Sequence, residues 1–293
     1  MRRNELAFSP VDRRKAGRLR ISCGVSTRLP GSARASVMRT ADYDSVSPRS
    51  YNARYRDEQY AGVQDALLSF VAKGPHDVLD VGAGTGRWLQ VLADAGCRVT
   101  GLDLSERMLA SAKDAAPAVR LVQGRAEALP FRDGVFDRVV CVNALHHFRD
   151  RLEFLKRARR VLRAGGEFMS IGLDPHAGVD VWWVYDYFPE TLALDRERFP
   201  AATFLRADML AAGFIGCHTR EVQHFERAVS LAAARALGLL ERDFTSQLTI
   251  LSDQEFQAGL ERLFRARERA YAGGAELALI TNLRLYATIG STP

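Results

Sequence analysis

The sequence predicts an α/β protein that is doubly wound around a mostly parallel sheet of seven strands, with a helical insert before the last strand. Short apolar segments alternate with amphipathic helical segments between residues 76 and 173, which is the order that repeated βαβ units produce. Three glycines stand where the first strand should pass into its helix, a position at which glycine permits a tight turn. The 293 residues, 47% of them apolar, are enough to enclose a full core.

The expected elements follow in order along the chain. A first helix is predicted in QYAGVQDALLSFVAKGP, because its apolar residues recur at helical spacing before Gly74 and Pro75 end it. The next strands are expected at 77–82, 98–104, 119–124, 136–145 and 165–173, with helices at 87–96, 105–116 and 151–162. After residue 173 we expect an aromatic loop, a short helix near 207–212, a strand at 217–225, a helical segment over 228–272 and a closing strand at 283–290.

The positive charge of the chain is concentrated at its N-terminus. Residues 1–40 carry ten Arg or Lys and two acidic residues, a balance of +8 within a total of +6, so the rest of the chain is near −2. We expect residues 1–41 to be a disordered basic tail and residues 42–293 to form the folded domain. The tail could be an extension without function, an organelle transit peptide or a polyanion-binding arm. Because the domain itself is nearly neutral, nucleic acid is not an expected partner.

Composition excludes several other classes. No run of about 18 uncharged apolar residues occurs, and no apolar signal segment lies near the N-terminus, so we expect a cytoplasmic protein without membrane contact. Cys23, Cys97, Cys141 and Cys217 are scattered without a CxxC pair, which predicts reduced thiols and no metal site. A monomer and a homodimer both remain open.

The glycine cluster at residues 82, 84 and 86 predicts a cradle for a phosphate or nucleoside, since glycine lets a ligand touch backbone amides at a helix N-terminus. Asp103 ends the next strand about 20 residues further on, the distance at which a carboxylate accepts hydrogen bonds from ribose hydroxyls. Dinucleotide sites use GxGxxG, but Arg87 stands where the third glycine of that motif would be. The spacing GxGxG therefore favours an adenosyl-amino acid over a pyrophosphate.

The segment VLDVGAGTG at 78–86 resembles the first motif of the class I S-adenosylmethionine-dependent methyltransferases. VTGLDLSERML, VQGRAEALPFRDGVFDRVVCVNALHHF and RVLRAGGEFMSIG follow in the order of that family, so the resemblance covers about residues 76–173. It implies a Rossmann-like methyltransferase fold over residues 42–293, S-adenosyl-L-methionine as the cofactor and methyl transfer as the reaction.

The resemblance also implies cofactor-binding residues, position by position. Those expected at the methionine end are Asp80, Gly82, Ala83, Gly84, Gly86 and Asn143, together with Tyr51 and Arg54 of the segment SYNARY, which is similar to the N-terminal cofactor lid of the family. Asp103 would hold both ribose hydroxyls, although it could also act as a charge at a helix N-terminus.

At the adenine end, the resemblance places Leu104 and Met108 over the base, although both could be core residues instead. The edge of the adenine would be contacted by the loop Arg125, Ala126 and Glu127. Many members of the family carry Asp at the position of Arg125. Because Arg has no hydrogen-bond acceptor, this contact would pass to Glu127 or to the backbone.

Residues of the acceptor site are harder to identify from the sequence, because methyl transfer mainly requires alignment of donor and acceptor. A base is needed only when the acceptor carries a proton. The candidate bases are His147 and His176, which follow the fourth and fifth strands and could equally be ordinary hydrogen-bonding residues. Trp183, Tyr185 and Tyr187 belong to a dense aromatic run that would be core, pocket wall or both. Residues 228–272 would form a helical cap over the acceptor, with a capping box at Ser252 and Glu255.

The predicted function is methyl transfer from S-adenosylmethionine to a small, apolar or aromatic metabolite at oxygen, nitrogen or carbon. Methylation of RNA or protein is a second hypothesis, which the nearly neutral domain and the sequence VNAL, in place of an NPPY motif, do not favour. A regulator that binds the cofactor without turnover is a third hypothesis. An NAD-dependent dehydrogenase is the remaining one.

Overall fold

The computed structural model describes residue 39 and residues 60–293. The predicted tail and the candidate residues Tyr51 and Arg54 lie outside this part of the chain. The chain divides into two units, residues 1–37 and residues 38–293, and every element given below belongs to the second unit.

The strands of the described chain form one sheet of eight strands, in the order β3-β2-β1-β4-β5-β8-β6 with β7 paired to β8. They are β1 (Asp77–Val81), β2 (Arg98–Asp103), β3 (Arg120–Gln123), β4 (Phe136–Val142), β5 (Leu162–Leu173), β6 (Val181–Trp182), β7 (Ile215–Ser230) and β8 (Ala278–Ser291). β1 to β5 are parallel, whereas β8 runs antiparallel to β5, β6 and β7. The predicted fold class is confirmed, with the short β6 as one strand more than expected.

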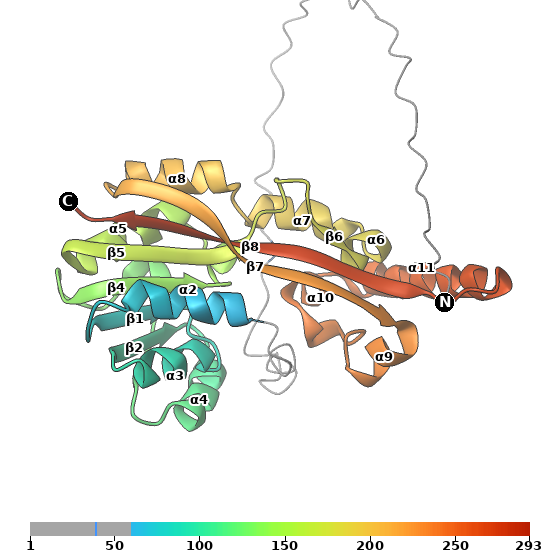
Figure 1. The fold of residues 1–293 in the computed structure, drawn as a ribbon, viewed down its shortest axis with the longest axis horizontal. Coiled ribbons are helices and arrows are strands. Elements are labelled where there is room, and N and C mark those ends of the chain that lie inside the picture. Colours follow the sequence, from blue (N-terminus) through green and yellow to red (C-terminus); the bar gives the residue numbers. More distant parts are fainter. Residues whose placement is uncertain (1–38, 40–59) are drawn as a thin grey trace, which may run out of the picture. The chain divides into compact units, whose positions relative to one another are not determined.

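Helices cover both faces of this sheet (Figure 1). The helices of the α/β part are α2 (Ala61–Val71), α3 (Arg87–Asp94), α4 (Glu106–Ala115), α5 (Arg151–Val161) and α8 (Ala202–Ala211). Residues of α2, α3 and α4 share one buried cluster with Val78 of β1, while residues of α5 and α8 share another with Leu79. Neighbouring strand residues point to opposite faces, so the sheet lies between two helical layers.

The strands β1 and β4 are neighbours in the sheet although β2 and β3 separate them in the sequence. The chain therefore leaves β1 toward β2 on one side and returns to β4 on the other. Ligands of doubly wound sheets bind in the crevice at this reversal, beyond the carboxyl ends of the strands. The loops after β1, β2 and β4 meet at that edge.

The C-terminal half of β7 and the N-terminal half of β8 carry a further group of helices, here called the cap (Figure 1). The cap comprises α6 (Trp183–Tyr187), α7 (Glu190–Arg198), α9 (Leu231–Ala236), α10 (Ser246–Thr249) and α11 (Asp253–Ala272), with a 3₁₀ turn at Arg242–Phe244. A third buried cluster, which includes Trp183, Phe188 and Leu263, holds it together.

Two sequence predictions for this region were wrong in detail. The segment 228–272 is not one helical stretch: β7 extends to Ser230, whose hydroxyl oxygen accepts a hydrogen bond from the Ala233 amide at 3.2 Å and so starts α9. The aromatic run after β5 is not a loop, because its side chains are buried and it forms β6 and α6. The expected short helix near 207–212 is α8, which begins five residues earlier, at Ala202.

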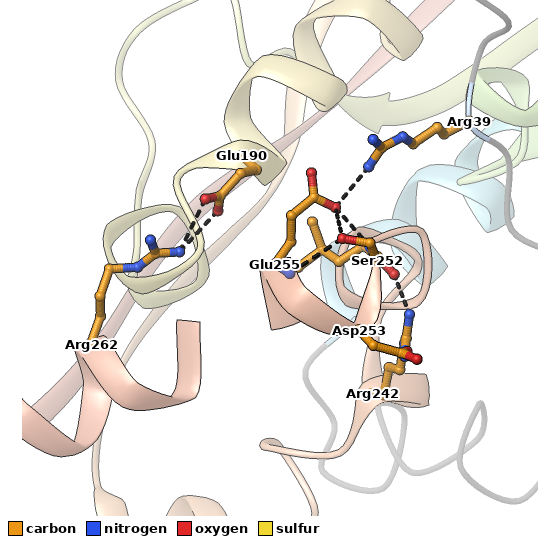
Figure 2. A network of polar contacts seen from close by, with 8 residues as sticks. Arg39, Glu190, Arg242, Ser252, Asp253, Glu255 and Arg262 are labelled. Carbon is orange, nitrogen blue, oxygen red and sulfur yellow. Dashed lines mark hydrogen bonds and ion pairs between the residues drawn. The ribbon is translucent and has the colours of Figure 1, made fainter. Parts of the chain in front are cut away.

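The predicted capping box at the start of α11 is confirmed. The Ser252 amide donates to Glu255 Oε2 at 2.7 Å, and the Glu255 amide donates to Ser252 Oγ at 3.2 Å (Figure 2). Ion pairs that join this helix to other segments include Arg262 with Glu190 of α7 at 3.0 Å and Arg39 with Glu255 at 2.8 Å (Figure 2). Arg242 also contacts Asp253, so α11 is held at its first turn and at its centre.

Among residues 60–293, no helix combines the length and apolar character that a membrane crossing requires. In the same part of the chain, no three His, Cys, Asp or Glu side chains gather in a way that could hold a metal ion.

Candidate active site

The loop between β1 and α3 is the first part of the candidate site. Gly82, Gly84 and Gly86 adopt φ angles of 79°, 54° and 86°, in the left-handed region that favours glycine. Space is as restrictive as conformation: a Cβ on Gly82 would lie 2.3 Å from the Cβ of Ala144, and one on Gly86 would lie 2.9 Å from the Cα of Ala112. This loop therefore needs glycine at both ends.

Hydrogen bonds fasten this glycine loop to the end of β2. The amides of Gly82 and Ala83 donate to the Leu102 carbonyl at 2.8 and 3.0 Å. Asp103 accepts the Gly84 amide on Oδ2 at 2.8 Å and the Ser105 amide on Oδ1 at 2.9 Å. A carboxylate oxygen has two lone pairs, so the half-buried Asp103 can accept ribose hydroxyls while it orders the loop.

Asp80 lies beneath this loop with only 1% of its surface exposed. Neither of its oxygens has a hydrogen-bond partner among the described residues. Burial, and secondly the charge of Asp103, raise the pKa of Asp80 to about 7. A buried carboxylate is costly unless it is paired, and the ammonium group of a bound S-adenosylmethionine would supply such a partner. The two carboxylates of the crevice, Asp80 and Asp103, thus fit the ammonium group and the ribose of this cofactor.

The residues predicted at the adenine end lie on the loops that follow β2 and β3. Leu104 is 58% exposed and offers an apolar surface, whereas Met108 is fully buried as a core residue. Ala126 is buried in a 3₁₀ turn. Glu127 accepts the Arg149 amide at 2.7 Å and lies 3.7 Å from Arg125, so it also orders the turn before α5. Binding of adenine by these residues stays a prediction.

Asn143 follows β4 and is, in the described chain, the single non-glycine residue with a positive φ, 50°. Its amide donates to the Ile171 carbonyl at 2.8 Å, which holds the strained backbone at the edge of the sheet. Its neighbour Ala144 contacts the glycine loop at Gly82. Asn143 also lines a large cavity, so it lies between the cofactor loop and that cavity.

This cavity, called the acceptor cavity below, has a volume of about 490 Å³. It is enclosed by the ends of β4 and β5, by β7 and β8, and by the cap. Its aromatic residues are Tyr60, Trp182, Trp183, Phe199, Phe225 and Phe244. Polar side chains at its wall include Asn143, His146, Gln223, His224 and Gln247. Tyr60 packs edge-on against Phe225 and Trp88, with ring centroids 4.9 and 6.3 Å apart, and so connects the cavity wall to α3.

The structure brings only part of the predicted acceptor residues to this cavity. Trp183 lines it, whereas Tyr185 and Tyr187 do not. Tyr185 instead donates its hydroxyl to Asp195 at 2.8 Å. Aromatic density in the sequence indicated burial here but could not separate cavity wall from core.

The two candidate bases also lie away from the cavity lining. The exposed His176 donates from Nε2 to the Phe199 carbonyl at 3.0 Å, which ties the loop after β5 to the end of α7. His147 is half-buried beside His146, with ring centroids 3.9 Å apart. His146, not His147, lines the cavity, where it stacks on Phe199 at a centroid distance of 3.9 Å.

Sequence reasoning missed the contribution of β7 to the cavity wall, and it expected a cap at 228–272 without naming its wall residues; Phe225, Leu239 and Gln247 were therefore not predicted. Phe225 stood at the end of a predicted strand, but the facing residues could be known only from the pairing of β7 with β8. No local signal marks Leu239 or Gln247, because both reach the cavity through the folding of the cap.

The glycine loop, the carboxylate at the end of β2 and the strand order define a Rossmann-like domain that binds a nucleoside cofactor. The family model "Methyltransferase domain" matches residues 79–170. The methyltransferase YcgJ of Bacillus subtilis is 35% identical over 135 residues, 43% of this chain and about half, 53%, of YcgJ. Demethylmenaquinone methyltransferase of Thermus thermophilus is 32% identical over 170 residues, 48% of this chain and 76% of that protein.

Solved structures show the same fold. The structure of YcgJ superimposes with a TM-score of 0.55 at 19% identity over 80% of this chain and 98% of YcgJ. Phosphoethanolamine N-methyltransferase 2 of Haemonchus contortus, in complex with S-adenosyl-L-methionine, gives 0.54 at 18% identity over 84% of this chain and 56% of that one. The chain belongs to the class I S-adenosylmethionine-dependent methyltransferases, and S-adenosylmethionine is its cofactor.

Proposed function

We propose that this chain transfers the methyl group of S-adenosylmethionine to a small, largely apolar or aromatic metabolite. The observation that carries this proposal is the acceptor cavity of about 490 Å³, lined mainly by aromatic and aliphatic side chains. Pockets for small molecules typically measure about 300–1,000 Å³. The cavity adjoins the glycine loop through Asn143 and Ala144, so an acceptor held there would lie next to the cofactor.

The chemistry asks little of the protein beyond alignment and exclusion of water. S-adenosylmethionine supplies an electrophilic methyl group on a sulfonium. The aromatic wall formed by Trp183, Phe199 and Phe225 would orient an apolar acceptor and exclude water from it. Two histidines line the cavity, His146 and His224. His146 is the proposed group for the proton of a hydroxyl or amine acceptor, because it lies beside Asn143 at the cofactor loop, whereas His224 Nε2 is hydrogen-bonded to Asn282 Oδ1 at 2.9 Å.

Two further facts support a small-molecule acceptor. The Thermus thermophilus relative is named for a small molecule, demethylmenaquinone. The chain outside residues 1–40 is also close to neutral, which offers little attraction to the phosphates of RNA. Methylation of RNA or protein and cofactor binding without turnover are therefore the alternatives that the experiment must separate.

The test is methyl incorporation from labelled S-adenosylmethionine into fractionated small metabolites, RNA and protein. Leu239→Trp places a larger side chain at the wall of the cavity and should lower incorporation at least tenfold, equal to about 1.4 kcal/mol. The affinity for S-adenosylhomocysteine should stay within about twofold. Leu210→Trp, at a 57% exposed position of α8, is the matched control and should have no effect.

Three outcomes would contradict this proposal. Label confined to RNA or protein would favour a macromolecular acceptor. Binding of S-adenosylhomocysteine without incorporation into any fraction would favour a regulator. Equal incorporation by Leu239→Trp and the unmodified protein would show that the acceptor does not occupy this cavity.

A further inference from the structure

A buried ion pair lies behind the wall of the acceptor cavity. Asp195 and Arg198 stand in the last turn of α7 with 0% and 3% of their surface exposed. Arg198 Nη2 donates to Asp195 Oδ1 at 2.6 Å. Both residues belong to the cap, whose buried apolar cluster includes Trp183, Leu248 and Leu251.

Asp195 is the centre of a small polar network. Besides Arg198, its carboxylate accepts the Tyr185 hydroxyl on Oδ2 at 2.8 Å and the Gln247 Nε2 on the same oxygen at 2.9 Å. Gln247 reaches it from α10, 52 residues further along the chain. Of these four residues, Gln247 is the one that lines the cavity.

Stability alone does not account for this network. A buried ion pair usually contributes little, because desolvation offsets the attraction, and apolar residues of the same volume often stabilise a protein more. Arg198 also leaves Nε and Nη1 without a hydrogen-bond partner among the described residues, which adds a further cost. Such a costly arrangement beside a binding cavity indicates a role in function.

The network fixes which end of the Gln247 amide is available to a ligand. Because the Asp195 carboxylate accepts hydrogen bonds, the amide must turn its NH₂ group toward it. The other end, Oε1, accepts one long bond of 3.3 Å from Ser246 Oγ. An amide oxygen has two lone pairs, so Oε1 keeps the capacity to accept a hydrogen bond from a molecule in the cavity.

We propose that Gln247 is a specificity-determining residue, which selects acceptors that carry a hydroxyl or N–H group on an otherwise apolar or aromatic skeleton. Asp195 is its positioning residue, held in turn by Arg198 and Tyr185. This inference rests on the proposed function, because it assumes that the acceptor occupies the cavity. An acceptor without a donor would remove Oε1 from water and leave it with only the long bond from Ser246 Oγ, which is unfavourable for a buried polar group.

The test compares two probes of the same shape, 2-naphthol and 2-methylnaphthalene, by ligand-observed NMR titration of the full chain with S-adenosylhomocysteine bound. The unmodified protein should bind 2-naphthol about tenfold more tightly, as expected for a site built around a hydroxyl. Gln247→Met should reduce the ratio of the two affinities, 2-naphthol over 2-methylnaphthalene, to about one through weaker binding of 2-naphthol. Gln257→Met, the same substitution at an exposed position of α11, is the matched control and should keep the ratio.

Positioning by Asp195 predicts that Asp195→Asn lowers the same ratio, since the amide of Gln247 is then free to turn over. The isolated charge of Arg198 could unfold that variant, so the double variant Asp195→Asn with Arg198→Met removes both charges and serves as the second test. A structural role alone would change stability but not the ratio between the probes.

The outcomes separate this inference from the proposed function. If both probes bind with equal affinity, or if Gln247→Met keeps the preference for 2-naphthol, the selectivity role of Gln247 is wrong while the cavity remains an acceptor site. If the folded Asp195 variants keep the ratio, positioning by Asp195 is wrong. If neither probe binds, the proposed acceptor class fails and this inference fails with it.

Discussion

Gly86 of the cofactor loop and Gly259 of the cap are both closed in by a neighbour, but the neighbours differ in kind. A Cβ on Gly86 would meet the backbone of Ala112 at 2.9 Å, at a φ of 86° that itself favours glycine. A Cβ on Gly259 would meet the ring of Phe188 at 2.0 Å, within an ordinary helix. The cofactor side is thus constrained by main-chain geometry, whereas the cap is constrained by a side chain that another residue could replace.

Two buried carboxylates extend the same comparison. Asp80, beneath the cofactor loop, has no hydrogen-bond partner in the described part of the chain. Asp195, in the cap, accepts hydrogen bonds from Tyr185, Arg198 and Gln247. On the cofactor side, the carboxylate of Asp80 is left for a ligand to pair with. In the cap, the carboxylate of Asp195 is already hydrogen-bonded by side chains of the protein. The cofactor half is therefore expected to respond to ligand and pH, and the cap to respond to packing.

The largest effect is expected for Gly86→Ala, which tests the main-chain constraint. A left-handed alanine costs about 1–2 kcal/mol, and contact with a backbone that cannot rotate away adds about 1–3 kcal/mol. We expect the free energy of unfolding, measured by urea denaturation, to fall by about 2–5 kcal/mol. Gly134→Ala is the control, because its φ of 63° is equally left-handed while nothing lies within 4 Å of the added Cβ. Equal losses of stability in both variants would show that the left-handed backbone, and not contact with Ala112, causes the effect.

Asp80→Asn tests the unpaired charge and should have the next largest effect. The pKa of Asp80 in the fold, about 7, lies above its unfolded value of about 3.9. As pH rises between these values, the unfolded chain loses its proton first, so the stability of the cofactor-free protein should decrease from about pH 4 to pH 7. Asp80→Asn should abolish this part of the decrease and raise the melting temperature at pH 8.

The same variant should weaken cofactor binding. Loss of a hydrogen bond to a charged group costs about 1.5–3 kcal/mol, so we expect the affinity for S-adenosylmethionine at pH 8 to fall at least tenfold. In the unmodified protein that affinity should increase from pH 6 to pH 8, since the bound ammonium favours the ionised carboxylate. Asp65→Asn, on the exposed side of α2, is the control. Melting profiles that match between Asp80→Asn and the unmodified protein would contradict this account.

The comparison also explains how much the sequence alone could predict. The loop glycines were predictable because a tight strand-to-helix turn demands them, and Ser105 was predictable as a cap because its hydroxyl oxygen accepts the Met108 amide, here at 3.2 Å. These signals are local, and each depends on one turn of chain. The fold class and the family follow from several such signals in a row, which is why they were correct.

The cap and the acceptor residues could not be predicted in the same way. Trp183 and Tyr185 stand two positions apart, yet one lines the cavity and the other donates to Asp195. The bond between Gln247 and Asp195 spans 52 positions and leaves no spacing in the sequence. The full length of β7 was not predicted because the charged Arg227 occupies a half-buried position between Phe225 and Val229, which interrupts the apolar alternation expected of a surface strand. These features depend on packing between distant segments.

The smallest of these effects is expected for Gly259→Ala, which tests the side-chain constraint of the cap. Alanine is favoured over glycine within a helix by about 1 kcal/mol, but overpacking against the buried ring of Phe188 costs about 1–3 kcal/mol. We expect a net loss of about 1 kcal/mol in the free energy of unfolding, measured by urea denaturation, with cofactor affinity unchanged. Phe188→Leu makes room for the added methyl group, so the double variant should be more stable than Phe188→Leu alone. If the double variant loses stability additively, the ring is not the constraint, and the difference between the two glycines does not hold.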